Sequence, residues 1–276
     1  MRGKLSKVLI YIALFIVAGY TLFPIVFLVI NSFKSQNEVV ASPLALPESF
    51  NFEYIINAAG KINFFSSLFI TFLITLFSVA LITVVSALAA WVMVRNKWKY
   101  SDILLLMFTA AMLIPFQAVM YPLLSLFENM GLKNILGLIL MYGGFGLSLS
   151  VLLYHGFIKS VPVSVEEAAV IDGANIFQMF FKIVFPLLKS STVTVIILNS
   201  MWIWNDYLLP FLVIGNGRMR TLTLELYFAK MTSGQYGNPW ELIFPAVFVS
   251  IIPIITVFLF LQKYIVKGVA DGAVKG

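Results

Sequence analysis

The chain has 276 residues, of which 61% are hydrophobic and only 11% are charged, and its formal net charge is +6. Soluble domains carry about 25% charged residues, and a soluble chain this apolar would expose large hydrophobic patches. The composition therefore excludes an ordinary soluble domain and indicates a membrane protein. The absence of cysteine and the single histidine, His155, exclude disulfides, thiolate chemistry and a multi-histidine metal site.

Six apolar stretches are long enough to cross a bilayer, which needs about 20 residues per helix. The first follows Arg2, Lys4 and Lys7, as in a signal peptide, but its apolar run is longer than the core of one. We therefore expect it to be a retained anchor, and the chain to be an all-α membrane protein with one transmembrane domain over residues 1–276. The predicted spans are 8–30, 67–94, 103–127, 135–157, 187–214 and 242–266.

The basic residues predict the orientation, because cytoplasmic loops of membrane proteins are enriched in Lys and Arg. With the amino terminus inside, twelve of the 18 Lys and Arg residues fall on the cytoplasmic side. The short cluster RNKWK after the second span is the clearest signal. Six spans then place both termini in the cytoplasm. The two long outer segments, about 31–66 and 215–241, each have room for a short helix.

The longest predicted cytoplasmic segment is 158–189, between spans four and five. It opens with a helix start, in which Glu166 and Glu167 occupy the first turn, where carboxylates suit the helix dipole. Gly173 is a turn signal, and a second helical run over 176–184 follows. Taken alone, these features are also compatible with an amphipathic linker that only joins two spans.

The spacing within this segment resembles the EAA motif of ATP-binding-cassette importer permeases. That motif is EAA, three residues, glycine, nine residues, isoleucine, one residue, leucine and proline; here only the leucine differs, with Phe185 in its place. The stretches SALAAWVMVR, WIWNDYLLPFL and KGVADGAVKG are similar to sugar-type members, in particular to the shorter permease of maltose and multiple-sugar importers. The positions that the motif assigns to ATPase coupling are Glu167, Ala168, Ala169, Asp172, Gly173, Ile183 and Pro186.

The resemblance implies a multi-pass permease subunit in the cytoplasmic membrane of a bacterium or archaeon. In this family the segment 158–189 contains a coupling helix that docks on a separate ATPase, and the spans alternate between inward and outward states. The implied partners are a second permease in a heterodimer, two ATPase subunits, an extracytoplasmic binding protein and a sugar, expected to be an oligosaccharide, with no nucleic acid. ATP and Mg²⁺ belong to the ATPase in this scheme.

No cofactor, metal or enzymatic activity is expected of the chain itself. The phosphate-binding pattern GxxxxGK[ST] is absent from the sequence. Two other classes predict different features. A secondary transporter or channel would show inverted repeats with broken helices and intramembrane ion sites, and a membrane-embedded enzyme would need clustered Asp, His, Ser or Lys in its spans.

Polar side chains inside spans are costly and point to function. In the fifth span, Asn199, Trp202 and Asp206 recur at helical spacing on one face. Amide and carboxylate groups accept hydrogen bonds from sugar hydroxyls, and tryptophan stacks on sugar rings; the alternative is that these residues join helices or form an interfacial aromatic belt. In the third span, Gln117 either lines the same path or satisfies backbone groups freed by Pro115. The candidate path residues are Gln117, Asn199, Trp202, Asn205 and Asp206.

Further residues carry weaker expectations. Gly143, Gly144 and Gly146 in the fourth span are expected to allow close helix crossing. His155, at the cytoplasmic end of that span, is interpreted as a snorkelling or interface histidine, not a proton relay. The outer segment 215–241 is either a solvated connector or, as the resemblance implies, a loop that contacts the binding protein. Its candidate contact residues are Tyr227, Gln235, Tyr236 and Trp240.

Overall fold

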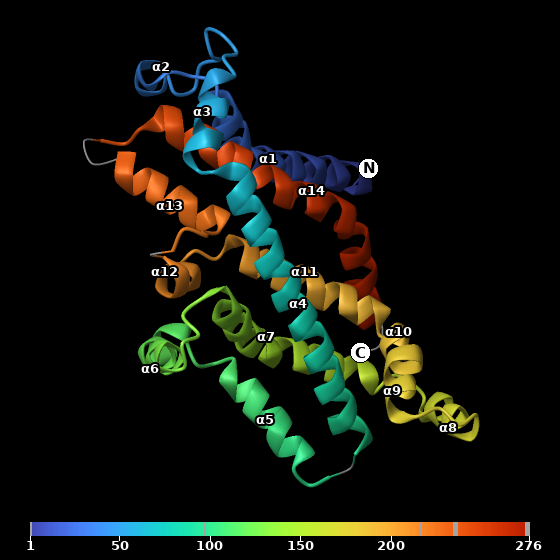
Figure 1. The fold of residues 1–276 in the computed structure, drawn as a ribbon. Helices are drawn as coiled ribbons and strands as arrows, with labels where there is room; N and C mark the ends of the chain where they lie inside the picture. Colours follow the sequence, from blue (N-terminus) through green and yellow to red (C-terminus); the bar gives the residue numbers. More distant parts are fainter. Residues whose placement is uncertain (1, 97, 216, 234–236, 274–276) are drawn as a thin grey trace. The chain divides into compact units, whose positions relative to one another are not determined.

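The computed structural model describes residues 2–96, 98–215, 217–233 and 237–273, which are helical without strands (Figure 1). This confirms the all-α prediction for the described residues. The helices are α1 (Arg2–Asn31), α2 (Gln36–Ala41), α3 (Glu53–Lys61), α4 (Phe64–Arg95), α5 (Ser101–Ala111), α6 (Phe116–Asn129), α7 (Ile135–Ile158), α8 (Val163–Ile171), α9 (Ile176–Gln178), the π-helix η1 (Met179–Val184), α10 (Phe185–Leu187), α11 (Lys189–Asn205), α12 (Leu208–Ile214), α13 (Leu222–Ser233) and α14 (Trp240–Ala273).

By length and composition, the described helices allow between four and six membrane spans. Four qualify alone, namely α1 over Lys7–Asn31, α4, α7, and α14 over Trp240–Phe260. Two pairs qualify only jointly, because each is bent at a short break. The bend is 102° between α5 and α6, and 79° between the run Ile176–Leu187 and α11.

Two predicted spans are not continuous helices, and the break in the second lies at Asp206 rather than at the 79° bend. The predicted span 103–127 is interrupted between α5 and α6, where Pro115 has extended backbone and precedes the first residue of α6. Proline has no N–H to donate and disfavours helix in the residue before it. The predicted span 187–214 is interrupted at Asp206, which also has extended backbone. Its carboxylate accepts a hydrogen bond from the Leu208 N–H at 2.9 Å, which replaces a bond of the helix ladder.

Helix α4 turns its small polar residues inwards and its large apolar residues outwards. Ser78 and Ser86 are fully buried, whereas Phe69, Phe72 and Phe77 are more than half exposed. No hydrophobic force drives helices together in lipid, so small residues that permit close backbone contact gather at the protein interior. The pattern is typical of a helix with protein on one side and lipid on the other.

The residues 68–221 and 254–276 form one compact unit, in which α7 contacts α5, α11 and α12. Gly143 and Gly146 let α7 approach α4 closely. A Cβ atom at Gly143 would lie 2.6 Å from Leu81 Cδ2, and one at Gly146 would overlap Ile82 Cδ1. The predicted close crossing is confirmed for these two glycines and is wrong for Gly144, where a Cβ would meet nothing within 4 Å.

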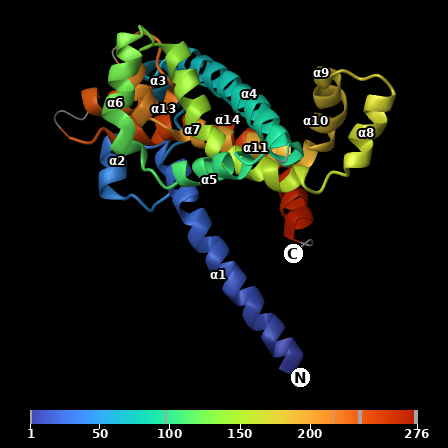
Figure 2. The same ribbon diagram turned by 90° about the horizontal axis from the view of Figure 1, so that it is seen from below.

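The residues 1–67 and 222–253 form the second compact unit. Figure 2 shows α1 extending away from α2 and α3 as one long helix. The segment after it is held by Lys34, a fully buried lysine whose Nζ donates to the carbonyls of Ser42 at 2.8 Å and Pro43 at 3.4 Å. Both long connecting segments contain helices, as expected, namely α2 and α3 in one and α13 in the other.

Candidate functional site

The segment 158–189, called the EAA segment below, folds as a helix, a glycine turn and a second helical limb. Helix α8 begins after Pro162 and ends before Gly173, which has φ +81°. This left-handed conformation favours glycine because a Cβ would strain it. The Gly173 N–H bonds to the Val170 carbonyl at 3.0 Å, and the Ala174 N–H bonds to the Ala169 carbonyl at 2.9 Å, which closes the helix end. The predicted helix and glycine turn are confirmed.

The second limb differs from the predicted α-helical run. A reciprocal capping box between Asn175 and Gln178 starts α9, but the chain then continues as the π-helix η1. In this wider turn the Phe185 N–H bonds to the Phe180 carbonyl, and Pro186, which has no N–H, follows. The buried ring of Phe180 contacts Phe185 at a centroid distance of 5.6 Å. π-turns insert one extra residue and often mark functional positions.

The motif positions divide by exposure. Helix α8 projects from the other helices of its unit in Figures 1 and 2. Its backbone neighbour is η1. Only one of the EAA residues is buried, since Ala169 is 6% exposed. The exposed motif positions are Glu167, Ala168, Asp172, Gly173 and Pro186, and Ile183 is half-buried.

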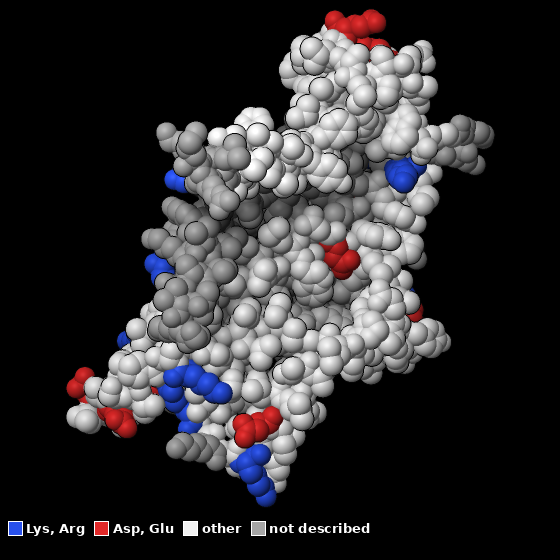
Figure 3. Space-filling view, turned by 180° about the vertical axis from the view of Figure 1, so that it is seen from behind, with Lys and Arg blue, Asp and Glu red and all other residues white. Residues whose placement is uncertain are grey.

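Charged side chains gather around α8 and the adjacent ends of α4, α5 and α7, at the bottom of Figure 3. Both signs are present there. The region thus offers a polar, water-exposed surface at one end of otherwise apolar helices. The exposed charged residues of this region include Lys99, Asp102, Lys159, Glu167, Asp172 and Lys182.

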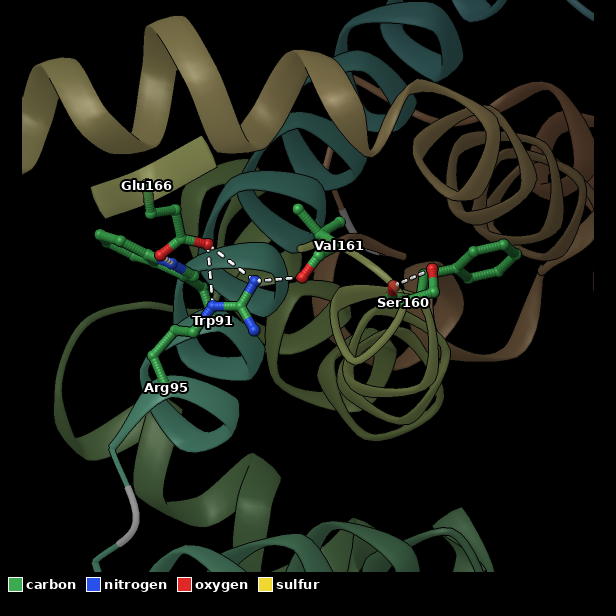
Figure 4. A network of polar contacts seen from close by, with 6 residues as sticks. Trp91, Arg95, Ser160, Val161 and Glu166 are labelled. Carbon is green, nitrogen blue, oxygen red and sulfur yellow. Dashed lines mark hydrogen bonds and ion pairs between the residues drawn. The ribbon is translucent and has the colours of Figure 1, made fainter. Parts of the chain in front are cut away.

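Glu166 has a structural role that its position at a helix start did not reveal. It is only 8% exposed, and its carboxylate accepts hydrogen bonds from Trp91 Nε1 at 3.0 Å and Arg95 Nε at 2.8 Å (Figure 4). Arg95 Nη2 lies 2.8 Å from Glu166 Oε1, the oxygen that also accepts from Arg95 Nε. Nη2 also donates to the Val161 carbonyl at 2.9 Å. The spacing of Trp91 and Arg95 puts both on one helix face, but nothing local shows that their partner lies 71 residues away.

Four of the five candidate path residues line one cavity of about 390 Å³, namely Gln117, Asn199, Trp202 and Asp206. Its walls come from α6, α7, α11 and α12, so three separate stretches of sequence meet there. Asn205 does not line this cavity. Its side chain is exposed, and its Nδ2 donates to the Met201 carbonyl at 2.7 Å.

Two of these polar residues also join helices, which was the alternative interpretation. Asn199 Nδ2 donates to Ser150 Oγ on α7 at 3.0 Å. Asp206 accepts a hydrogen bond from the Tyr142 hydroxyl at 2.9 Å. The Tyr142 ring meets Trp202 edge-on at 5.4 Å. The cavity thus combines aromatic walls with polar groups whose positions are set by packing.

The candidate contact residues of segment 215–241 are only partly described. The ring of Tyr227 on α13 contacts Phe228 at 5.6 Å. The Trp240 N–H donates to Gln36 Oε1 at 2.7 Å, which ties the start of α14 to α2. Gln235 and Tyr236 lie outside the described residues.

His155 is 8% exposed within α7, so its side chain is packed inside the protein. Neighbouring helices cover it because α7 is the central helix of its unit, contacted by α5, α11 and α12. Among the described residues, no three His, Asp or Glu side chains come together as a metal site.

The chain is similar in sequence to known transport permeases and in fold to a solved transporter. The chain is 39% identical to a probable starch degradation products transport system permease protein of Thermoanaerobacterium thermosulfurigenes, over 91% of each chain. It is 32% identical to the melibiose/raffinose/stachyose import permease protein of Bacillus subtilis, over 100% of this chain and 99% of that protein. The fold matches the crystal structure of a bacterial ABC transporter for import of the acidic polysaccharide alginate, with TM-score 0.80, 22% identity and coverage of 95% and 96%.

The model of one protein family matches residues 82–271, which include the EAA segment and the cavity described above. Broken helices are also found in secondary transporters, but this match and the relatives decide the class. The chain belongs to the family of binding-protein-dependent transport system inner membrane components.

Proposed function

We propose that this chain is a permease subunit of an ATP-driven sugar importer, coupled through α8 to a separate ATPase and supplied by an extracytoplasmic binding protein. The observation that carries the proposal is the exposed face of α8. Glu167, Ala168 and Asp172 point away from the packing of their own chain, beside a turn that only glycine adopts without strain. A small residue lets a partner surface approach closely, and a charge fixes the register of the contact.

The relatives support a sugar as the cargo. Their names include starch degradation products, multiple sugars, and melibiose, raffinose and stachyose. Most of these are oligosaccharides, so we propose an oligosaccharide here. The cavity beside Trp202 supplies aromatic surface for stacking and amide and carboxylate groups for hydroxyls, and we propose that Gln117, Asn199, Trp202 and Asp206 line the sugar path.

The proposed topology is a single permease domain with six spans, in which α5 and α6 together form the third span and α11 and α12 together form the fifth. Both termini and α8 lie in the cytoplasm, and the charged region around α8 then faces water and the ATPase. Closure of two ATPase subunits on ATP moves α8 and switches the permease pair between inward and outward states, as a rigid-body transition. The partner permease is a second, different chain, and segment 215–241 faces the binding protein.

The coupling claim is tested in proteoliposomes that contain the complex purified through a tag on this chain. We expect Glu167→Lys to reverse the docking charge, and Gly173→Asp to strain the turn. Both should abolish ATP-driven sugar uptake and weaken co-purification of the ATPase. The matched control is Glu128→Gln, which removes an exposed carboxylate paired with Lys133 at 3.5 Å. If both α8 variants retain uptake, the docking role of α8 is wrong.

The path claim is tested with Trp202→Ala, whose ring lines the cavity and is 41% exposed. Loss of one stacking surface should raise the KM for sugar uptake by up to about tenfold, since an aromatic contact contributes on the order of 0.5–1.5 kcal/mol. Trp98→Ala removes a ring that is 59% exposed and lies outside the cavity. If the two variants have the same KM, Trp202 does not line the sugar path.

A further inference from the structure

We infer that Trp91, Arg95 and Glu166 form a joint that makes α8 move together with α4. The inference rests on the proposed function, in which α8 receives the motion of the ATPase. It assigns to Glu166 a role different from that of Glu167. Glu167 is exposed, whereas the adjacent Glu166 carboxylate faces Trp91 and Arg95 of α4 (Figure 4).

The hydrogen bonds reach both α8 and its connection to α7. Arg95 is the last residue of α4, and Trp91 lies one turn earlier. Their N–H groups converge on the Glu166 carboxylate at 2.8 and 3.0 Å. The same guanidinium donates to the carbonyl of Val161, two residues before α8 begins, at 2.9 Å. Arg95 therefore holds α8 at Glu166 and the connection to α7 at Val161, which prevents α8 from pivoting freely on that connection.

The second limb of the EAA segment is held by the same helix end. The ring of Trp91 lies 5.5 Å from the ring of Phe180, which is 1% exposed in η1. Trp91 therefore contacts η1 through its ring and α8 through its N–H. Since α8 packs its backbone against η1, the whole segment is attached to α4 through one tryptophan and one arginine.

The ion pair in this joint resists separation, because both of its charges are largely buried. The side chains of Arg95 and Glu166 are only 17% and 11% exposed. A buried ion pair adds little stability compared with apolar residues, but separation of its partners leaves a desolvated charge without compensation. A small displacement of α8 therefore moves the end of α4 with it. Helix α4 extends from Phe64 to Arg95, so the motion is passed along a single long element.

The test compares sugar uptake and ATP hydrolysis in the same proteoliposomes. We expect Glu166→Gln and Trp91→Phe to keep the ATPase bound and hydrolysing, while the sugar moved per ATP falls by about fivefold or more, the usual lower range of an allosteric coupling. Trp91→Phe keeps an aromatic ring against Phe180 and removes the N–H donor together with one ring of the indole, so it is the mildest change at this position. Glu128→Gln should leave both rates unchanged.

A third variant restores the connection by other means. The chain has no native cysteine, so Arg95→Cys with Glu166→Cys introduces one thiol on each side and leaves no buried charge unpaired. We expect this double variant to be uncoupled, and a short thiol–thiol cross-linker to restore the ratio of sugar to ATP. A merely stabilising ion pair would not give this recovery.

The outcomes separate the joint from the proposed function. If the complex hydrolyses ATP and the two single variants and the double variant all keep the wild-type ratio of sugar to ATP, the inference that α8 is joined to α4 is wrong. The same conclusion follows if cross-linking the uncoupled double variant changes nothing. If the wild-type chain binds no ATPase, the proposed function itself fails. Glu167→Lys should lose the ATPase, whereas Glu166→Gln should keep it, so the two adjacent carboxylates give different readouts.

Discussion

At the scale of single residues, one carboxylate serves both the fold and the candidate site. Asp206 lines the cavity, accepts a hydrogen bond from the Tyr142 hydroxyl, and accepts another from the Leu208 N–H at the start of α12. A broken helix leaves backbone groups that need partners within an apolar region. Asp206 supplies one of those partners, so its position is determined by the break in the helix.

We predict that Tyr142→Phe lowers the free energy of unfolding by about 1 kcal/mol, the usual size of a side-chain hydrogen bond between membrane helices. Asp206→Ala should cost more, about 2 kcal/mol, because it also leaves the Leu208 N–H without its acceptor. Unfolding of the purified chain in detergent micelles measures both. Tyr121→Phe is the control, since that ring is 82% exposed, and an equal effect of the two tyrosine variants would contradict the prediction.

A second carboxylate acts outside the spans. Glu38 forms a capping box with Ser35 at the start of α2, and its other oxygen accepts a hydrogen bond from the Glu48 N–H at 3.1 Å. Hydrogen bonds from the backbone of Ser35 and Glu48 hold the pKa of Glu38 below its ordinary value of 4.5, with a smaller contribution from the Lys34 charge. These bonds favour the ionised form, because only the carboxylate accepts both.

The lowered pKa gives a pH dependence with a definite sign. The stabilisation by Glu38 is fully present above pH 4.5. It is lost as the pH falls from there through the lower pKa of the folded state, because the unfolded state binds the proton first. Amide hydrogen exchange of residues 42–48 should therefore accelerate below pH 4.5 relative to the intrinsic rate. Glu38→Gln should remove this acceleration, and an unchanged pH profile in that variant would overturn the assignment.

At the scale of elements, the crossing of α7 and α4 depends on which glycine of the sequence GGFG faces the neighbour. Gly146 faces Ile82 and Asn199, where a Cβ would lie 2.8 Å from Asn199 Oδ1, whereas Gly144 faces open space. Two positions only two residues apart point to different sides of a helix. The composition of the stretch indicates close packing, and only the helix phase selects the residue.

This pair of glycines provides a matched comparison. Gly146→Val should lower the free energy of unfolding by about 1–3 kcal/mol more than Gly144→Val, because overpacking forces neighbouring side chains apart. Both changes carry the same helix propensity, so their difference isolates the crowding against α4. Denaturation in detergent gives the two values. Equal values would mean that α7 and α4 are not in contact at Gly146.

At the scale of the whole molecule, the absence of native cysteine makes the proposed topology directly measurable. Single cysteines at Lys61 and Lys133 should react with a membrane-impermeant maleimide in intact cells. Cysteines at Lys99 and Lys159 should react only after permeabilisation, because six spans with an inside amino terminus place them in the cytoplasm. Labelling of all four from outside, or of Lys99 and Lys133 from the same side, would contradict the six-span arrangement.

The sequence by itself determined the features that depend on neighbouring residues. Runs of apolar residues predicted the long helices, and the order of Glu166, Gly173 and Pro186 predicted a helix, a glycine turn and a second limb. These succeed because apolar length, helix capping and the preference of glycine for positive φ act within a few residues. The same motif, through its fixed spacing, indicated the family.

Only the tertiary structure decided the contacts between distant segments. The π-helix η1 and the phase that buries Gly146 depend on what each segment packs against. Glu166 shows the limit most clearly. Its sequence position indicates a helix start, but its partners Trp91 and Arg95 lie 75 and 71 residues away. A buried charge takes its role from whatever group compensates it, and that group is known only once α4 and α8 lie side by side.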